Sequence, residues 1–349
     1  MNRQNVAIFF GGISSEYSVS LESAYSVISN LNPEKYTAVP VGISPDGRWF
    51  YFTGTPEKIR QDTWCNEIDC IPAALSVNRG AHQLLLFLPD RTETVTLDAA
   101  FPVMHGKGGE DGTLQGLIEM AGIPLVGCGV LASALCMDKD RAHRLAQTAG
   151  VTVPRALSIR AGYDTSSVLV FAEHIDYPLF VKPVKAGSSY GVTKVQQADE
   201  LLPAIALAFQ YDDTVILEEN IDGYEVGCAI MGYDELTVGE VDEIELSGGF
   251  FDFTEKYTLK TSAIHVPARI DSATAERIKQ TARTLYRALG CGGFARVDMF
   301  LTPDGRIVFN EINTIPGFTE HSRFPGMMKA AGISFPEIID HLIQEAMTL

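Results

Sequence analysis

The sequence predicts an α/β protein, with an N-terminal domain built on a mostly parallel sheet and an α+β part after it. Three observations carry this prediction. Strand-like residues 6–10 are followed by a helical stretch at 18–30 and a second strand-like run at 37–43, and this βαβ order favours parallel strands. From about residue 128 onward, helices and short strands alternate less regularly. A β-hairpin signal lies near the C-terminus, at 296–313.

Length and composition predict more than one soluble domain. A chain of 349 residues is too long for a single small core. Its 46% hydrophobic and 20% charged residues are typical of a globular protein. We expect an N-terminal α/β domain at 1–128, a central subdomain at 129–217 and a C-terminal subdomain at 218–349.

The remaining elements follow from local signals. Gly122 comes directly after the helical stretch 113–121, at the position where a left-handed glycine commonly ends a helix. Further helices are expected at 132–149, 166–175, 199–209 and 272–289, and two more close the chain. Further strands are expected at 83–88, 95–104, 179–183, 192–195, 215–218, 226–231, 236–245 and 263–268.

Charge and cysteine usage exclude several classes of protein. A formal net charge of -17 argues against a nucleic-acid partner, because phosphates require a basic surface. No apolar run approaches the roughly 18 residues of a membrane span, and the first residues lead into a strand pattern without a secretory signal. The six cysteines are scattered and have no metal-ligand spacing. We therefore expect a cytoplasmic protein with reduced thiols and no membrane partner.

The C-terminal hairpin decides which polar side chains share a face of the sheet. Residues 302–305 (TPDG) are a turn signal between two strand-like runs. A four-residue turn pairs Leu301 with Arg306, which places Asp298 opposite Phe309. In the same register Arg296 lies opposite Glu311. The face that carries these acidic residues then holds Arg296, Asp298, Glu311 and Asn313, with Phe300, Ile307 and Phe309 nearer the turn. The other face is mostly apolar, apart from Arg306 and Asn310.

Two carboxylates and an amide at the open end of a hairpin predict a site for a hard cation. Asp298, Glu311 and Asn313 offer only oxygen ligands, which suits Mg²⁺. Arg296 beside them can hold an anion. The alternative is a surface ladder of salt bridges, which contributes little energy and no function.

A glycine- and serine-rich loop follows the strand at 179–183. Backbone N–H groups of this loop, next to Lys182, can cradle phosphate oxygens. The Walker A spacing is absent, and an ordinary hairpin turn is the alternative. Lys139 contributes only if its helix meets this loop. Glu218, Glu219 and Glu225 can present carboxylates to an adenosine group, or can simply be exposed charges.

Two further loops follow strand ends, where open α/β sheets place their ligands. Glu16 lies in the loop after the first strand, where it can orient an ammonium group or favour the dipole of the following helix. His105 lies in a glycine-dense polar loop. Residues 247–261 are too long for a tight turn, and we expect either a lid or an exposed loop. No order of Ser, His and Asp or of Cys and His supports a covalent hydrolase.

These stretches together resemble the D-alanine:D-alanine ligase family of ATP-grasp enzymes over nearly the whole chain. The matching pieces are GGISSEYSVS, HGKGGEDGTLQG, GCGVLASALCMDKDRAH, VKPVKAGSSYGV, EKY, ARVDMF and NEINTIPGFTEHSR. The resemblance implies an ATP-grasp fold with ATP held between the central and C-terminal subdomains, and a homodimer.

The resemblance also implies roles for individual residues. The metal ligands would be Asp298, Glu311 and Asn313, for two Mg²⁺ ions that Mn²⁺ can replace. The ATP site would comprise Lys139, Lys182, Ser188, Glu218, Glu219, Ile221, Glu225 and Lys256. The first D-alanine would lie against Glu16, Val19 and His105, with Ser188 and Tyr257 linking it to the lid. The second substrate and the oxyanion would face Arg296, Gly317 and Ser322.

Two positions bear on the second substrate. Tyr257 matches ligases that use an amino acid, whereas relatives that use D-lactate carry His in that region. Arg323 stands where D-alanine-specific members commonly have an apolar residue, and it can donate hydrogen bonds to a hydroxyl group. This combination resembles the VanG-type D-alanine:D-serine ligases of vancomycin resistance, with Asp242 or Phe251 completing the serine pocket.

Three hypotheses follow. The first is an ATP-dependent D-alanine:D-serine ligase that makes peptidoglycan precursors through a D-alanyl phosphate. The second is a housekeeping D-alanine:D-alanine ligase in which Arg323 is a neutral departure. The third, in a different class, is a nucleotide-binding regulator that keeps the fold without turnover.

Overall fold

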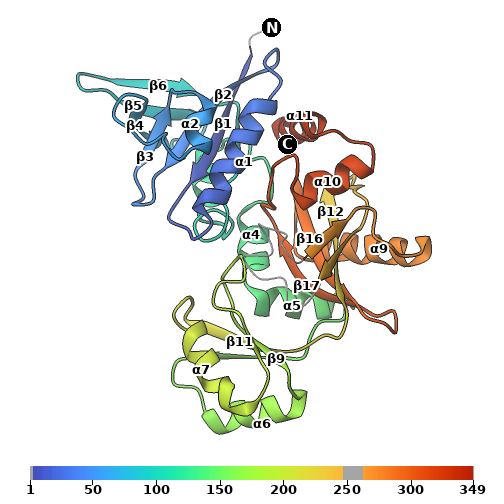
Figure 1. Cartoon of the computed structure of the whole chain (residues 1–349). Helices are drawn as coiled ribbons and strands as arrows, with labels where there is room; N and C mark the ends of the chain where they lie inside the picture. The colour runs from blue at the N-terminus through green and yellow to red at the C-terminus, as the bar shows by residue number, and fades with distance from the viewer. Residues whose placement is uncertain (1–2, 247–261, 349) are drawn as a thin grey trace.

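Three β-sheets organise the protein, as seen in a computed structural model that describes residues 3–246 and 262–348 (Figure 1). The first sheet has seven strands in the order β6-β5-β4-β3-β2-β1-β7. The second has four, in the order β10-β9-β11-β8. The third has six, in the order β15-β14-β12-β16-β17, with β13 paired to β12. Each sheet forms one lobe in Figure 1, and the lobes meet around α4 and α5. In the part of the chain that the structure describes, no helix is long and apolar enough to cross a membrane.

The predicted βαβ unit opens the N-terminal sheet. It consists of β1 (Gln4–Gly11), α1 (Tyr17–Asn30) and β2 (Tyr36–Ile43), and β1 pairs in parallel with β2 and with β7 (Ala99–Pro102). The pairs from β2 outward to β6 are antiparallel, so the sheet is mixed, where the sequence predicts a mostly parallel one. Short connections join β2 to β3, β4 to β5 and β5 to β6, which antiparallel neighbours allow and parallel ones do not, whereas the connection from β3 to β4 contains a short helix at 56–60.

Several elements of this part differ from the sequence-based prediction. Strands β3 (Trp49–Phe52) and β4 (Cys70–Leu75) are absent from the prediction, and the expected strand at 95–104 divides into β6 (Thr92–Thr96) and β7. The sheet also contains β5 (Gln83–Phe87), and its helices include α2 (Pro56–Arg60) and α3 (Thr113–Ala121). As predicted, Gly122 ends α3 in the left-handed conformation, with φ 74°.

The helix expected at 132–149 is broken into two. α4 (Val130–Met137) is followed by Asp138, and α5 (Lys139–Thr148) begins directly after that residue. Asp138 has extended backbone angles, and its side chain accepts a hydrogen bond from the backbone N–H of Arg141. A capping aspartate of this kind starts a new helix and stops the previous one. Both helices pack on the C-terminal sheet, since their buried alanines and cysteines share a core with β12, β16 and β17.

The central sheet carries its own small core. Its strands are β8 (Ala156–Arg160), β9 (Leu179–Pro183), β10 (Thr193–Val195) and β11 (Thr214–Glu219), and its helices are α6 (Thr165–Ile175) and α7 (Ala198–Ala208). The expected domain boundary after residue 217 falls inside β11, which stays paired with β9 as far as Glu219.

The C-terminal sheet and its helices complete the fold. The strands are β12 (Tyr224–Met231), β13 (Thr237–Val238), β14 (Asp242–Leu246), β15 (Ser262–His265), β16 (Phe294–Leu301) and β17 (Ile307–Asn313). The helices are α9 (Ser272–Ala288), α10 (Arg323–Ala330) and α11 (Phe335–Thr348). α11 leaves the C-terminal sheet and packs against α1 and β7, so a single core spans the N- and C-terminal lobes.

The register of the β16–β17 hairpin differs from the predicted one in two places. Leu301 pairs with Ile307, so one extra residue lies in the turn. A bulge after Asp298 adds a second, and Asp298 therefore pairs with Glu311 instead of Phe309. Arg296 correspondingly pairs with Asn313 instead of Glu311. Because the two shifts add up to two residues, each side chain beyond the bulge lies on the face predicted for it. All four polar residues therefore share one face, as predicted.

Between the bulge and the turn only the first shift applies. The residues of β17 in this part therefore lie on the face opposite to the predicted one. Phe309 and Ile307 lie with the core residues instead of on the polar face. Phe300 pairs with Val308 and lines a cavity. Asn310, which the predicted register leaves as a polar misfit on the apolar face, lines that same cavity because of the bulge.

Candidate functional site

Two adjoining cavities lie where the three lobes meet. The first has a volume of about 930 Å³ and is lined by loops of the N-terminal sheet, by the end of β17 and by the start of α10. The second, of about 520 Å³, lies between the central and C-terminal sheets. Their walls share Lys139, Ala186, Ser188 and Glu311. The sequence-predicted site residues that the structure describes are gathered around these two spaces.

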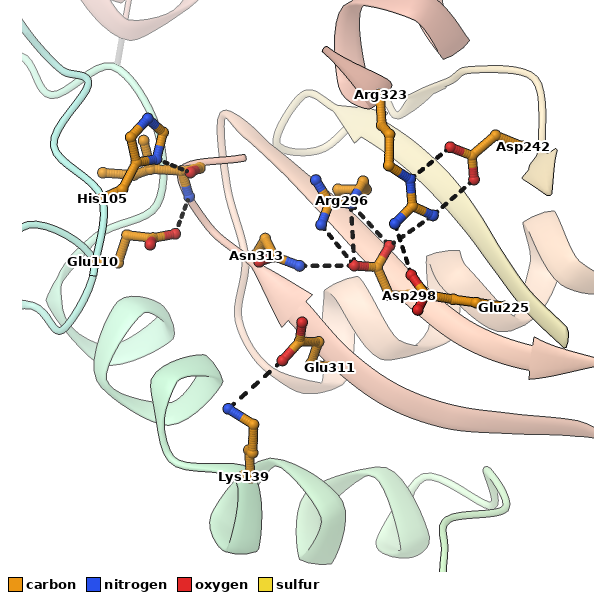
Figure 2. Close-up of polar contacts among 11 residues, drawn as sticks. His105, Glu110, Lys139, Glu225, Asp242, Arg296, Asp298, Glu311, Asn313 and Arg323 are labelled. Atoms are coloured by element: carbon orange, nitrogen blue, oxygen red, sulfur yellow. Dashed lines mark hydrogen bonds and ion pairs between the residues drawn. The ribbon is translucent and has the colours of Figure 1, made fainter. Parts of the chain in front are cut away.

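Asp298 is the buried centre of a cluster of charged side chains (Figure 2). Arg296 donates to both of its oxygens, with Nη2 at 2.7 Å from Oδ2. Asn313 donates to Oδ2 at 2.9 Å, and a second guanidinium, that of Arg323, lies 3.4 Å from Oδ1. Burial alone would lower the pKa of Arg296, but the Asp298 carboxylate outweighs it and the pKa lies above its usual value.

Arg323 is held by further carboxylates. Its Nε and Nη2 donate to Asp242 at 2.7 and 2.9 Å, and its Nη1 donates to Glu225 at 2.7 Å. Gly227 makes room for the pair, because a Cβ there would lie 2.5 Å from both Asp242 Oδ1 and Arg323 Nη2. Arg323 is 9% exposed and forms part of the wall of the first cavity. The sequence predicts Arg323 as a hydrogen-bond donor, but it does not reveal that three carboxylates surround it.

Glu311 stands between the two cavities and lines both of them. Its Oε2 lies 3.6 Å from the ammonium group of Lys139, which also donates to the backbone oxygen of Ala186 at 2.9 Å. The start of α5 therefore does meet the glycine- and serine-rich loop, which is the condition under which Lys139 was expected to contribute. Among the described residues, no group of three or more His, Cys, Asp or Glu side chains is arranged to hold a metal ion.

The donor set around Glu311 suits a hard cation that brings part of its own coordination shell. Glu311 and Asn313 line the first cavity and offer oxygen atoms, while Asp298 lies one layer deeper beneath Arg296. Mg²⁺ typically takes one or two carboxylates and completes its shell with water and phosphate. The side chains present fit that pattern, and Glu311 is the carboxylate of this set that lines a cavity.

A buried ion pair closes one end of the second cavity. Lys182 Nζ lies 2.6 Å from Glu218 Oε2, and the ring of His143 approaches Glu218 Oε1 at 3.6 Å. Burial disfavours the Glu218 carboxylate, but the charges of Lys182 and His143 outweigh it, and the pKa of Glu218 lies below its usual value. Lys182 also lies 5.4 Å from the centre of the Phe180 ring. A cation and an aromatic face therefore share one wall of this cavity.

The other predicted residues of the second cavity lie along its rim. Ile221 and Glu225 line it, and Glu225 reaches through to Arg323 on the side of the first cavity. Glu219 also lines it, and its carboxylate accepts from the side chain and backbone of Arg155 at 2.6 and 2.9 Å. The carboxylate of Glu219 is therefore engaged by a neighbouring strand.

Glu16 connects the N-terminal sheet to the central one. Its carboxylate accepts a short hydrogen bond from Ser188 in the glycine- and serine-rich loop, 172 positions away. Gly106 and Gly187 flank this carboxylate so closely that a Cβ at either position would collide with it. Ser188 itself has a left-handed backbone, with φ 49°, which is uncommon for a residue with a side chain. The structure thus brings together Glu16 and Ser188, which the sequence places in separate motifs.

His105 and Glu110, from one N-terminal loop, both form hydrogen bonds with the backbone of Ile315 (Figure 2). His105 Nδ1 donates to the Ile315 oxygen at 2.9 Å, and burial lowers the pKa of this imidazole. The neutral ring then accepts at Nε2 from the Ser23 hydroxyl. Glu110 accepts the N–H of Ile315 at 3.1 Å and that of Gly106 at 2.7 Å. Burial and the nearby Glu16 raise the pKa of Glu110 to about 8.

Glu110 is a site residue that the sequence-based prediction missed. It lies in the same glycine-dense loop as His105, and only its long-range contacts distinguish it from an exposed acid. Val19, Gly317 and Ser322 line the first cavity as expected. The lid at 247–261, with Phe251, Lys256 and Tyr257, lies outside the described residues.

The chain is similar to known proteins over almost its whole length. The family model described as D-ala D-ala ligase N-terminus matches residues 5–128, and the one described as D-ala D-ala ligase C-terminus matches residues 145–344. The structure of VanG D-Ala:D-Ser ligase from Enterococcus faecalis superimposes with a TM-score of 0.92 at 53% identity, covering 99% of this chain and 100% of that one.

Two relatives match over almost their full lengths. The vancomycin B-type resistance protein VanB of Enterococcus faecalis is 46% identical over 98% of both chains. A D-alanine–D-alanine ligase of Caldicellulosiruptor bescii is 39% identical over 99% of this chain and 96% of its own length. The chain therefore belongs to the D-alanine–D-alanine ligase family and is an ATP-dependent ligase with the ATP-grasp fold.

Proposed function

We propose that the protein joins D-alanine to D-serine at the expense of ATP and so makes D-alanyl-D-serine for peptidoglycan precursors, the reaction that underlies vancomycin resistance. The observation that carries this proposal is the position of Arg323, whose guanidinium forms part of the wall of the first cavity. Its hydrogen bonds to Asp242 and Glu225 use three of the five N–H groups of an arginine. Because Nη2 also lies 3.4 Å from Asp298 Oδ1, the N–H that remains on Nη1 is the donor for a substrate hydroxyl group.

The similarity to VanG supports the same specificity. The VanG structure is that of a D-Ala:D-Ser ligase, and it shares 53% of its residues with this chain. Asp242 is 0% exposed and fixes Arg323 by a two-point contact, so the guanidinium is pre-oriented. A site built to hydrogen-bond a hydroxyl group discriminates strongly against substrates that lack it.

ATP is proposed to occupy the second cavity. Phosphate oxygens would lie near Lys139 and Lys182, next to the backbone of the loop that carries Ser188. Adenine and ribose would lie against Glu218, Glu219, Ile221 and Glu225. Lys256 and the lid at 247–261 would complete this site. A cation and an aromatic ring on one wall, with carboxylates along the rim, are the features that suit a nucleotide.

The proposed domains are those predicted from the sequence, 1–128, 129–217 and 218–349, with the second boundary moved past Glu219 to the end of β11. Because the reaction consumes ATP, we place it in the cytoplasm. A homodimer is proposed from family membership.

The first D-alanine is proposed to lie in the first cavity. Its ammonium group would meet Glu16, whose carboxylate is fixed by Ser188 and by the two flanking glycines. Val19 and His105 would contact the rest of the molecule, and Tyr257 would link it to the lid. The second substrate would lie between Ser322 and Arg323, with Arg296 and the Gly317 N–H facing the developing oxyanion.

The chemistry proceeds in two steps. A carboxylate oxygen of the first D-alanine attacks the γ-phosphorus of ATP, the bond to the bridging oxygen breaks, and ADP leaves. The amine of the second substrate then attacks the acyl carbon, phosphate leaves with the electrons of the C–O bond, and the ammonium loses a proton to solvent. Arg296 and the Gly317 N–H stabilise the tetrahedral oxyanion, which exists after the amine attacks and before phosphate leaves.

Two Mg²⁺ ions, which Mn²⁺ can replace, are proposed at Asp298, Glu311 and Asn313. When bound, the metal offsets the negative charge of the transferring phosphoryl group. The residues around it contribute orientation and the exclusion of water, which would otherwise hydrolyse the acyl phosphate.

A housekeeping D-alanine:D-alanine ligase is the second candidate, and one observation favours it. Arg323 is already surrounded by Asp242, Glu225 and Asp298, which is a complete electrostatic role without any substrate. If that is its only role, the pocket gains nothing from a hydroxyl group on the second substrate.

A competition experiment separates the two candidates. Purified protein is given ATP, Mg²⁺ and D-alanine with equimolar D-serine, and the dipeptides are identified by mass. We expect mostly D-alanyl-D-serine. A product that is mostly D-alanyl-D-alanine would contradict the assignment of Arg323 and identify the housekeeping reaction.

The Arg323→Lys variant tests the residue itself. Lysine keeps the charge but cannot make the two-point contact with Asp242, so the donors are no longer oriented. We expect the ratio of D-serine to D-alanine product to fall by about tenfold or more. Arg269→Lys is the matched control, because Arg269 makes a similar two-point contact with Glu243 on the same strand but lines neither cavity. An equal change of product ratio in both variants would count against a specific role.

A further inference from the structure

The turn that carries Gly317 is attached to the N-terminal lobe by hydrogen bonds at three places. Glu110 accepts the N–H of Ile315 at 3.1 Å, and His105 donates to its carbonyl oxygen at 2.9 Å. The hydroxyl of Ser23 on α1 accepts the N–H of Phe318 at 3.4 Å. We name residues 315–318 the oxyanion turn. Gly317 therefore lies between Ile315 and Phe318, and both of these residues are hydrogen-bonded to side chains of the N-terminal lobe.

Among the described residues, Glu110 links the oxyanion turn to the loop at 105–110 by accepting one backbone N–H from each. Its Oε2 accepts from Gly106 and its Oε1 from Ile315, so each oxygen holds one lobe. Gly106 in turn lies against the carboxylate of Glu16, the proposed contact of the first substrate. Glu110 and His105 of this loop therefore together fix the distance between the loop at 105–110 and the oxyanion turn.

We propose that Glu110 is a positioning residue, which holds the Gly317 N–H at the place where the oxyanion of the tetrahedral intermediate forms. This inference rests on the proposed function, because it takes Gly317 as the oxyanion donor. Donors that stabilise an oxyanion must be fixed before the charge develops, and an error of about 1 Å can cost on the order of 100-fold in rate. Glu110 does not touch the reacting atoms in this account and acts through the backbone of Ile315 and of Gly106.

The Glu110→Gln variant removes one of the two hydrogen bonds that Glu110 accepts from the backbone. Glutamine keeps the size of the side chain but has one acceptor oxygen in place of two, and its NH₂ group would face a backbone N–H. The oxyanion turn or the substrate loop then loses its partner. We expect kcat for dipeptide formation to fall about 10- to 100-fold, with a much smaller change in KM for ATP.

The ratio of ADP to dipeptide distinguishes positioning from simple stability. If the turn is displaced, the acyl phosphate still forms, but the amine attacks it more slowly and more of it is lost to water. ADP released per dipeptide should therefore rise above the wild-type ratio in Glu110→Gln. A variant that is merely less folded loses both products together, and its ratio stays unchanged.

Asp111→Asn is the matched control. Asp111 is the next residue, and its carboxylate also accepts two backbone N–H groups, those of Gly108 and Thr113. Gly108 belongs to the same loop and Thr113 is the first residue of α3, so both partners are local, and Asp111 lines neither cavity. We expect this variant to keep the wild-type ratio and a rate within about threefold of wild type.

Glu110→Asp provides a second test if Glu110→Gln does not fold, because the shorter acid keeps both acceptor oxygens but cannot span both loops. A raised ratio in either Glu110 variant, together with a normal ratio in Asp111→Asn, supports the proposal. A normal ratio in the Glu110 variants overturns it, whether the rate is unchanged or falls together with the thermal midpoint. The assay uses whichever second amino acid the wild-type protein accepts, so a failure of the D-serine assignment leaves this test intact.

Discussion

Replacing Glu311 by glutamine is expected to lower the rate of dipeptide formation by about 10²- to 10⁴-fold. Glu311 is the only carboxylate that lines both cavities within the described part of the chain. The bulge after Asp298 sets these two acids directly opposite each other, and Lys139 lies 3.6 Å from Glu311. Glutamine keeps the shape but removes the negative charge that would attract a divalent cation. The measurement is the steady-state rate as a function of Mg²⁺ concentration.

The dependence on Mg²⁺ gives this prediction its specificity. Glu311→Gln should require more Mg²⁺ for half-maximal rate, because a ligand has lost its charge. Asp304→Asn is the control in the same hairpin, since Asp304 pairs with Arg306 at the exposed turn and lines neither cavity. We expect the control to resemble wild type. An unaltered Mg²⁺ requirement in Glu311→Gln would contradict the proposed metal site.

The hairpin illustrates what the sequence can and cannot predict. The alternation of side chains places Asp298 and Glu311 on one face, because parity survives any even change of register. The direct partners do not follow, since neither the extra residue in the turn nor the bulge has a local signal. Asn310 is the one residue of this hairpin that hints at the bulge. It is polar where the predicted register expects an apolar residue, and such a misfit is a fair signal for a bulge.

Long-range contacts account for most of what the sequence-based prediction missed. The local pattern of residues 105–113 predicts a ligand loop, and the structure adds that Glu110 reaches Ile315, which is 205 positions away. Arg323 likewise has partners 81 and 98 positions distant. The break between α4 and α5 is a local feature, because Asp138 is a good capping residue. It was missed because the apolar periodicity continues across it.

Lys182→Ala is the other substitution with a large expected effect. Lys182 is a cation on the wall of the second cavity, and the proposed phosphate contact would lose its charge. We expect kcat/KM for ATP to fall by about 10²- to 10⁴-fold while the protein remains folded. Lys185→Ala is the control on the same loop, because Lys185 faces Asp212 and Asp213 and lines neither cavity. Near-normal turnover of Lys182→Ala would contradict the phosphate assignment.

The double variant Lys182→Ala/Glu218→Gln separates catalysis from stability. Removing Lys182 alone leaves the Glu218 carboxylate buried without its nearest cation, which typically costs about 3 kcal/mol or more of unfolding free energy. Neutralising Glu218 removes that penalty, so the double variant should recover much of the lost thermal stability. It should not recover turnover, because the phosphate still lacks its cation. Recovery of both would mean that Lys182 serves only to neutralise Glu218. Because Glu218 is itself proposed to contact adenosine, the Glu218→Gln single variant is the reference: if it keeps turnover, recovery of stability alone in the double variant assigns Lys182 to the phosphate.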